Sequence, residues 1–280
     1  MTHRLETQAV TVGYGEEPVV RDLDLTIADR RVTTIVGPNG CGKSTLLRTM
    51  ARLLKPTSGA VLLDGEPVQD IATREVARRM ALLPQSPIAP EGLLVRDLVG
   101  RGRHPHQRWF SQWSPEDETI VESALEMTDT SELRDRALDQ LSGGQRQRAW
   151  IAMTLAQDTE IMLLDEPTTY LDLAHQVEVL DLVTRLNRER NRTVVMVLHD
   201  LNLAARYSDV IVVMKDGAVV CEGDPTTVFT SAMLAETFGL EADVLSDPRT
   251  ELPIIVPTSS AAQVERLTPA DRELAHAPHA

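Results

Sequence analysis

One ten-residue stretch, VGPNGCGKST at residues 36–45, restricts the possible folds of this chain more than any other feature. Gly37, Gly42, Lys43 and Ser44 have the spacing G-x-x-x-x-G-K-[ST], directly after an apolar run and before the helical pattern TLLRTMARLL. Glycines let backbone N–H groups surround a phosphate, and the start of the following helix carries about half a positive charge. Chance would produce this spacing in about one chain in a hundred, so we expect a nucleotide site on a strand–loop–helix unit.

Short β-branched runs alternate with helical patterns along the chain, which indicates an α/β fold with a mostly parallel sheet. The runs RRVTTIVG, EIMLLD and RTVVMVLHD are continuously apolar rather than alternating, as in strands that are buried on both faces. The pairs Asp64-Gly65 and Asp216-Gly217 predict two tight hairpin turns, and hence antiparallel strands beside the parallel ones.

A helical region interrupts this alternation. It includes the pattern SPEDETIVESALEMT, in which Ser114 is placed as N-cap and Pro115 occupies the first helical position. After residue 239, proline and small polar residues become frequent, which predicts a loosely attached tail. The predicted domains are an ATP-binding α/β core over residues 1–85 and 159–239, an inserted helical subdomain over 86–158, and a C-terminal tail over 240–280.

Composition limits the class of protein. The formal net charge of -14 opposes non-specific nucleic-acid binding, and two cysteines, Cys41 and Cys221, are too few for a disulfide framework. No run approaches the roughly 18 apolar residues of a membrane-spanning helix, and the polar first ten residues lack the apolar centre of a secretory signal. We therefore expect a soluble, cytoplasmic chain with no nucleic-acid partner.

Two adjacent carboxylates stand at the end of the strand-like run IMLLD: Asp165 is its last residue and Glu166 follows it. Asp165 is the expected Mg²⁺ partner of Ser44, and Glu166 is placed to polarise an attacking water as a general base. Acidic residues after an apolar strand also commonly cap the following helix, so this pair alone leaves the chemistry open.

The stretch LSGGQRQR, residues 141–148, is more specific. Ser142, Gly143 and Gly144 precede a helical pattern and would offer backbone donors to a second anion, although they would also suit an ordinary N-cap. Together with the phosphate loop, this stretch resembles the signature of the ATP-binding cassette (ABC) family. The resemblance implies a P-loop NTPase core of the RecA type, with a mostly parallel sheet, an antiparallel β subdomain and an inserted helical subdomain.

The resemblance also implies roles for single residues. Glu166, Gln85 and His199 are expected to be catalytic, with His199 at the γ-phosphate, and Ser44, Gln85 and Asp165 are expected to bind Mg²⁺. Asp172 is expected to belong to the D-loop. Many members of the family have serine in this loop at the position that Thr169 occupies here. The expected ATP-binding residues are Tyr14, which would stack on adenine, Gly37, Pro38, Asn39, Gly40, Cys41, Gly42, Lys43, Ser44 and Thr45. The signature residues expected to contact ATP in trans are Leu141, Ser142, Gly143, Gly144 and Gln145.

One phosphate loop and one signature imply a homodimer, because in this family the signature of each subunit closes over the nucleotide of the other. PTTYLDLAHQ and VLHDLNLAARYSD further resemble the ATPases of bacterial importers for ferric siderophores, haem and cobalamin. We therefore expect a peripheral ATPase on the cytoplasmic face of the membrane, working with permease subunits and indirectly with an external binding protein. Ferric siderophore is the expected cargo; a haem or cobalamin importer, or a soluble ATPase of iron–sulfur cluster assembly, remains open.

The segment RGRHPHQRWFSQW, residues 101–113, concentrates basic and aromatic side chains in an acidic chain. Such side chains are frequent at protein interfaces and suit a surface near anionic headgroups, so one hypothesis is that the segment docks the permease. The alternative is that Trp109 and Trp113 pack in the core of the helical subdomain. Stacking on nucleic acid, or a metal site at His104 and His106, would be further interpretations, but the proline between the two histidines keeps them off one helical face.

Overall fold

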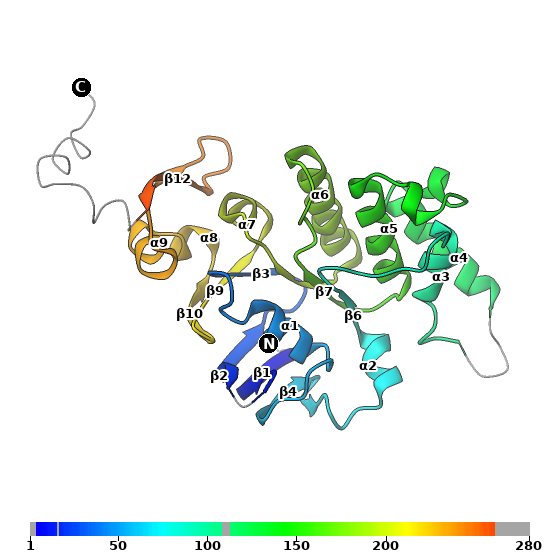
Figure 1. Cartoon of the computed structure of the whole chain (residues 1–280), viewed down its shortest axis with the longest axis horizontal. Coiled ribbons are helices and arrows are strands. Elements are labelled where there is room, and N and C mark those ends of the chain that lie inside the picture. Colours follow the sequence, from blue (N-terminus) through cyan, green and yellow to red (C-terminus); the bar gives the residue numbers. More distant parts are fainter. Residues whose placement is uncertain (1–3, 16, 108–112, 261–280) are drawn as a thin grey trace, which may run out of the picture.

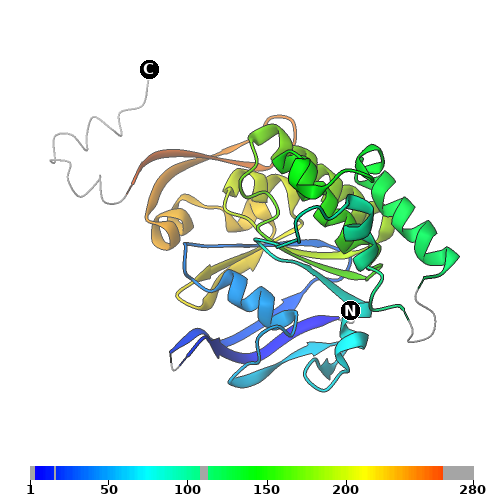
Figure 2. The ribbon, with the colours of Figure 1, turned by 45° about the vertical axis from the view of Figure 1, so that its right-hand side comes forward.

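Two β-sheets of different type form the framework of the molecule, and helix α1 (Lys43–Met50) lies between them (Figure 2). The computed structural model describes residues 4–15, 17–107 and 113–260. The larger sheet has the order β10-β9-β3-β8-β7-β6; five of these strands are parallel, and β10 pairs antiparallel with β9. The bounds are β3 (Val32–Val36), β6 (Met80–Leu83), β7 (Ile161–Asp165), β8 (Thr193–Val197), β9 (Val210–Lys215) and β10 (Ala218–Gly223).

The central strands of this sheet are buried on both faces. Every residue of β3, β7 and β8 is buried, as the continuous apolar runs predicted. Successive side chains point to opposite faces, so Val194 and Met196 pack among the outer helices while Val195 and Val197 pack in the cluster around α1. The predicted α/β fold class with a mostly parallel sheet is confirmed.

The smaller sheet is antiparallel, with the order β2-β1-β4-β5. Its strands are β1 (Leu5–Gly13), β2 (Pro18–Ile27), β4 (Ser58–Leu63) and β5 (Glu66–Pro67). Asp64 and Gly65 join β4 to β5 with φ angles of 53° and 83°, and Asp216 and Gly217 join β9 to β10 with φ angles of 49° and 83°. Both predicted tight turns are present, with the two positive φ angles that such hairpins need.

Helices α3 (Val95–Arg101), α4 (Pro115–Met127) and α5 (Gly143–Ala156) pack on one another beyond the β6 edge of the parallel sheet (Figure 1). The predicted start of α4 is confirmed: the Ser114 hydroxyl accepts a hydrogen bond from the backbone N–H of Asp117, and Pro115 begins the helix. The remaining helices are α2 (Thr73–Arg79), α6 (Leu173–Arg190), α7 (Leu201–Tyr207), α8 (Pro225–Val228) and α9 (Ser231–Phe238), with 3-10 turns at Ser131–Leu133 and Leu138–Gln140.

Part of the region predicted as a tail is an antiparallel hairpin, β11 (Leu240–Ser246) with β12 (Pro253–Ser260). Its inner side packs beside α7, where the Asn202 amide donates to the carbonyl of Ile255 and accepts from the Ile255 N–H. Proline suggested a break in structure, but Pro253 stands at the first position of its strand, where a missing N–H is tolerated. Residues 261–280 lie outside the described part of the chain.

None of the helices within residues 4–15, 17–107 and 113–260 combines the length and the apolar character needed to cross a bilayer.

Candidate functional site

The candidate site gathers where neighbouring strands of the parallel sheet end. The glycine-rich loop leaves β3, Gln85 follows β6, Asp165 and Glu166 stand at the end of β7, and His199 follows β8. Because β3, β8, β7 and β6 are adjacent and parallel, their carboxyl ends lie along one edge of the sheet. Ligands of open α/β sheets bind at this edge, so the topology alone brings these four segments together.

The loop between β3 and α1 requires glycine at both ends. Gly37 and Gly42 have φ angles of 155° and 103°, which other residues rarely adopt. A Cβ atom on Gly37 would also lie 2.1 Å from the carbonyl oxygen of Met214 on β9. The loop therefore runs directly against the sheet, and α1 begins at Lys43 with its N-terminus facing the loop.

Lys43 is buried at the start of α1, and its Nζ donates to the carbonyl oxygens of Gly37 and Pro38, both at 2.9 Å. The ammonium group thus lies within the loop that would surround a phosphate. Two carbonyl oxygens are modest partners for a full charge, so an anionic ligand would be a stronger one.

Ser44 and Asp165 form a polar pair beside the loop. The Ser44 hydroxyl donates to Oδ1 of Asp165 at 2.7 Å, and burial raises the pKa of that carboxyl above its ordinary value. The other oxygen, Oδ2, is buried and accepts no hydrogen bond from the described residues; the Arg48 guanidinium is 3.8 Å away. A hydroxyl beside a buried carboxylate oxygen without a hydrogen-bond partner fits a hard cation such as Mg²⁺.

The Glu166 carboxylate is held by three side chains. Its Oε1 is 2.6 Å from Nε2 of His199, and its Oε2 accepts from the Gln85 amide at 2.5 Å and from the Thr169 hydroxyl at 2.9 Å. Burial opposes the charged form, but hydrogen bonds, the strongest from His199, outweigh it and hold the pKa of Glu166 below its ordinary value. The residue is therefore an ionised carboxylate, the state that a general base requires.

A pocket of about 290 Å³ opens over the phosphate loop. Tyr14 lies at its side, 62% exposed, and its hydroxyl is 3.5 Å from the Arg48 guanidinium. The lining residues are Tyr14, Val19, Asn39, Gly40, Gly42, Lys43, Ser44, Thr45, Glu166 and His199. Most of the residues predicted for ATP binding and catalysis thus surround a single pocket. Among the other expected residues, Gln85 contacts Glu166 rather than Ser44 or Asp165.

The signature residues and Asp172 do not line this pocket. Ser142 is the N-cap of α5: its hydroxyl accepts from the N–H of Gln145, and the Gln145 side chain accepts from the N–H of Ser142. Ser142 and Gly143 are exposed, while Leu141 and Gly144 are buried. Asp172 caps α6 in the same way, through the N–H of His175.

The sequence did not identify Arg48 as a residue of the site, and it indicated no role for Thr169. Arg48 lies one turn after Ser44 and reaches both Tyr14 and Asp165, and Thr169 donates to Glu166. A basic residue four positions after the phosphate-loop serine was the only available signal for Arg48, and it does not predict the contact with Tyr14.

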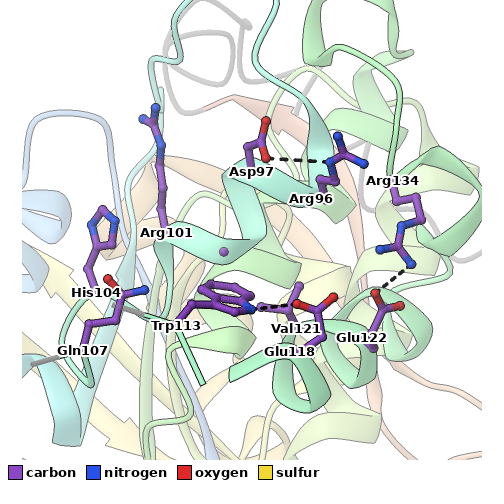
Figure 3. Close-up of a pocket in the computed structure, with 11 residues that line it drawn as sticks. Arg96, Asp97, Arg101, His104, Gln107, Trp113, Glu118, Val121, Glu122 and Arg134 are labelled. Atoms are coloured by element: carbon purple, nitrogen blue, oxygen red, sulfur yellow. Dashed lines mark hydrogen bonds and ion pairs between the residues drawn. The ribbon is translucent and has the colours of Figure 1, made fainter. Parts of the chain in front are cut away.

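The basic and aromatic segment 101–113 divides between interior and surface. Arg103 is buried, with its Nε 2.8 Å from Asp117 Oδ1 and its Nη1 donating to the carbonyl of Ala156, and His106 contacts the carbonyl of Gln157. Trp113 is 46% exposed and donates to Glu118 at 2.8 Å, at the side of a pocket of about 480 Å³ (Figure 3). Arg108, Trp109 and Phe110 lie outside the described residues.

Figure 3 shows the side chains of Arg101, His104 and Gln107 on one side of this second pocket and the start of α4 on the other. In the described part of the chain, no three His, Cys, Asp or Glu side chains are grouped as a metal site would require. The pairing of His104 and His106 as metal ligands therefore gains no support there.

Comparison with known proteins gives consistent results. Residues 20–169 match the model of the family described as ABC transporter. A petrobactin import ATP-binding protein of Bacillus anthracis is 50% identical over 277 residues, covering 99% of each chain. A ferric enterobactin transport ATP-binding protein of Escherichia coli strain K12 is 48% identical over 259 residues, covering 92% of this chain and 96% of that protein.

Among solved structures, a dimeric bacterial ABC transporter cassette superposes with a TM-score of 0.70 at 31% identity, covering 79% of this chain and 98% of that one.

Proposed function

This chain belongs to the ABC transporter family, among the ATP-binding subunits of siderophore, iron-chelate and cobalamin importers, and from that premise we propose that its ATPase activity drives uptake of a ferric siderophore. The observation that carries the ATPase part is the grouping of Lys43, Ser44 and the ionised Glu166 around one pocket. The cargo part rests on relatives about half identical over nearly their whole length, whose names specify petrobactin and ferric enterobactin.

In the proposed reaction, Glu166 accepts a proton from the water that attacks the γ-phosphate. A positioned carboxylate of this kind contributes about 10²–10⁴-fold to the rate. His199 and Gln85 contact the two carboxylate oxygens from the ends of β8 and β6, the strands on either side of β7, which fixes the direction in which the base points. Lys43 turns from its loop carbonyls to the β- and γ-phosphates, and backbone N–H groups of the loop and of α1 stabilise negative charge there.

We further propose that Ser44 and Asp165 hold Mg²⁺, with Gln85 close by. The buried Oδ2 of Asp165, which accepts no hydrogen bond from the described residues, supports this assignment. Held by Ser44 and Asp165, Mg²⁺ would supply positive charge that neutralises the negative charge developing on the phosphate. A divalent cation there would favour the charged form of Asp165, against the burial that raises the pKa of this carboxyl.

The proposed active unit is a homodimer. Within one chain the signature residues lie away from the phosphate-loop pocket and are partly exposed, so a second copy would have to supply them. The dimeric cassette among the similar structures supports this arrangement. Closing the dimer around ATP and opening it after hydrolysis would be a ligand-driven shift between two states.

We propose that an integral permease binds at the second pocket, the one beside Trp113. The ATPase would then work at the cytoplasmic face of the membrane. Arg101, His104 and the half-exposed Trp113 offer basic and aromatic groups at the side of this pocket. Gln85 lies at the start of the segment that leads from β6 to α3, and its contact with Glu166 connects this region to the phosphate-loop pocket. Arg101→Ala combined with Trp113→Ala is expected to reduce transport severalfold while ATP hydrolysis by the isolated protein stays within twofold; equal loss of both would reject this docking surface.

Uptake by cells tests the proposed cargo. A strain without the native gene is supplied with the wild type, with Lys43→Ala, or with Lys55→Ala, which changes an exposed lysine outside the site. Labelled ferric siderophore and labelled cobalamin are then offered separately. The proposal expects iron uptake to fail in Lys43→Ala only, and cobalamin uptake to be equal in all strains.

The other outcomes reassign the cargo. Loss of cobalamin uptake alone would make the chain a vitamin importer subunit. Unchanged uptake of both would remove the iron proposal and direct the search to haem or to a soluble partner such as iron–sulfur cluster assembly.

A further inference from the structure

The first turn of α6 lies against the two glycines that begin α5. A Cβ atom built on Gly144 would lie 2.4 Å from Cδ2 and 2.9 Å from Cγ of His175, closer than real Cβ atoms approach. A Cβ atom on Gly143 would meet only Leu171, at an ordinary 3.7 Å. The edge of the His175 ring therefore lies in the space that a side chain at position 144 would need, and a residue other than glycine there would have to displace the ring.

The His175 ring is fixed in this place by Asp172. Both the backbone N–H and the Nδ1 of His175 contact Oδ1 of Asp172, at 3.0 Å and 2.7 Å. The N–H of His175 is the main reason that the pKa of the Asp172 carboxyl is lowered, so Asp172 is an ionised acceptor. A carboxylate can only accept hydrogen bonds; Nδ1 therefore carries a hydrogen, and the ring is held in one orientation.

The same segment is connected to the catalytic carboxylate. Thr169 donates to Oε2 of Glu166 at 2.9 Å, and the Gln176 amide donates to the carbonyl of Leu171 at 3.0 Å, which holds the turn between β7 and α6. Glu166 is thus linked to Thr169 by a hydrogen bond, and residues 169–172 lead along the chain to Asp172, which holds His175. The His175 ring in turn lies against Gly144.

We propose that His175 is a positioning residue that sets the Gly143–Gly144 backbone for the partner's nucleotide. The inference rests on the proposed homodimer, in which these glycines act on the other subunit's ATP. Each chain would then link its own Glu166 to the site that its signature completes. His175 touches no nucleotide in this scheme; it acts through the glycines.

The test separates binding by one chain from closure of the dimer. In the Glu166→Gln background, His175→Ala and His175→Asn are compared with Glu178→Ala. Glu178 also joins α6 to α5, through Arg148 at 3.4 Å, but has no contact with the glycines, so it is the matched control. The affinity of dilute monomer for a fluorescent ATP analogue with Mg²⁺ is measured first, and dimer formation is followed by light scattering.

We expect every variant to bind nucleotide as a monomer within about twofold of the Glu166→Gln parent. The ATP concentration needed for half-maximal dimer should rise about tenfold for His175→Ala, as for loss of one charge-assisted hydrogen bond. His175→Asn, which can keep a bond to Asp172 but lacks the ring, should behave like His175→Ala. Glu178→Ala should match the parent.

A second variant pair examines the contact itself. Gly144→Ala should prevent dimer formation when His175 is present, because the new methyl group displaces the ring. In combination with His175→Ala the same change should add little, since the ring that it would strike is gone.

Unchanged dimer formation by His175→Ala would overturn the inference, and so would an equal loss of monomer affinity, which would indicate a general structural role. If the Glu166→Gln parent itself stays monomeric with saturating Mg-ATP, the proposed shared-site homodimer fails instead.

Discussion

Two loops of this molecule have similar glycine-rich sequences and both begin a helix, yet they lie in opposite environments. The phosphate loop before α1 runs against β9, and Lys43 and Thr45 behind it are only 5% and 6% exposed. The loop before α5 leaves Ser142 and Gly143 at the surface. The first loop shares its pocket with Glu166 and His199 of the same chain, whereas the second loop is exposed, as the proposed shared site of a homodimer would require.

Among the variants that test this comparison, Glu166→Gln should have the largest effect, on the rate of ATP hydrolysis. Glutamine keeps one oxygen that can accept from Gln85 and Thr169, but it cannot accept the proton, so hydrolysis should fall by about 10²–10⁴-fold. ATP binding to the phosphate loop should persist and hold two chains together through the outward loop. Turnover assays and light scattering with saturating Mg-ATP measure both effects. Hydrolysis near the wild-type rate would show that another group is the base.

Asp117 and Asp165, buried aspartates of the helical region and of the core, should respond oppositely to pH. Against the opposing effect of burial, Arg103 lowers the pKa of Asp117 below the ordinary 3.8, so its stabilisation is present above that value and is lost as the pH falls through the lowered pKa. Burial raises the pKa of Asp165, so stability from this group is greatest below 3.8 and declines as the pH rises through the raised pKa.

Urea unfolding of the wild type, Asp117→Asn and Asp165→Asn from about pH 2 to pH 7 tests this difference, because the lowered pKa of Asp117 lies below 3.8 and the raised pKa of Asp165 lies above it. At pH 7, Asp117→Asn should cost about 3–5 kcal/mol, because it leaves the buried Arg103 without its charged partner. Asp165→Asn should unfold at a higher urea concentration than the wild type while losing Mg²⁺-dependent hydrolysis. A loss of stability in both variants would contradict the opposite shifts.

Ser142→Ala is a smaller change, on the outward loop. Loss of the cap at the start of α5 should reduce the free energy of unfolding by about 1 kcal/mol. Nucleotide affinity of the monomer should be unchanged, because Ser142 does not line the phosphate-loop pocket, while dimer formation should weaken. Thermal unfolding and equilibrium binding separate the two effects; weaker monomer binding would place Ser142 in its own chain's site.

Asn202→Ala should have the smallest effect on hydrolysis and on dimer formation. It removes the two hydrogen bonds that join α7 to the C-terminal hairpin, each worth about 1 kcal/mol or less in a partly exposed position. Hydrogen exchange at the Ile255 amide should accelerate, since Asn202 accepts from it, and hydrolysis should stay within about twofold. A large loss of hydrolysis would mean that the hairpin holds the His199 loop in place.

Local patterns predicted much of the fold and part of the site. The buried strands, the Asp-Gly turns, the start of α4 and the phosphate loop each depend on residues within about ten positions of one another, so their physical causes are visible in a short stretch. The topology of a parallel sheet then explains why residues as far apart as Lys43, Glu166 and His199 were expected together: each follows a strand, and the strand ends share one edge.

Other contacts were decided only by the tertiary structure. Arg48 with Asp165, Arg103 with Asp117, Asn202 with Ile255 and the His175 ring on Gly144 join residues whose own neighbourhoods in the sequence give no sign of the partner. The prolines near residue 253 even suggested an unstructured tail, because a local pattern cannot show that a helix fifty residues earlier offers an amide to the chain. Caps, turns and strand burial arise from neighbours along the chain, whereas a side chain's partner across space is fixed only once the sheet and helices have packed.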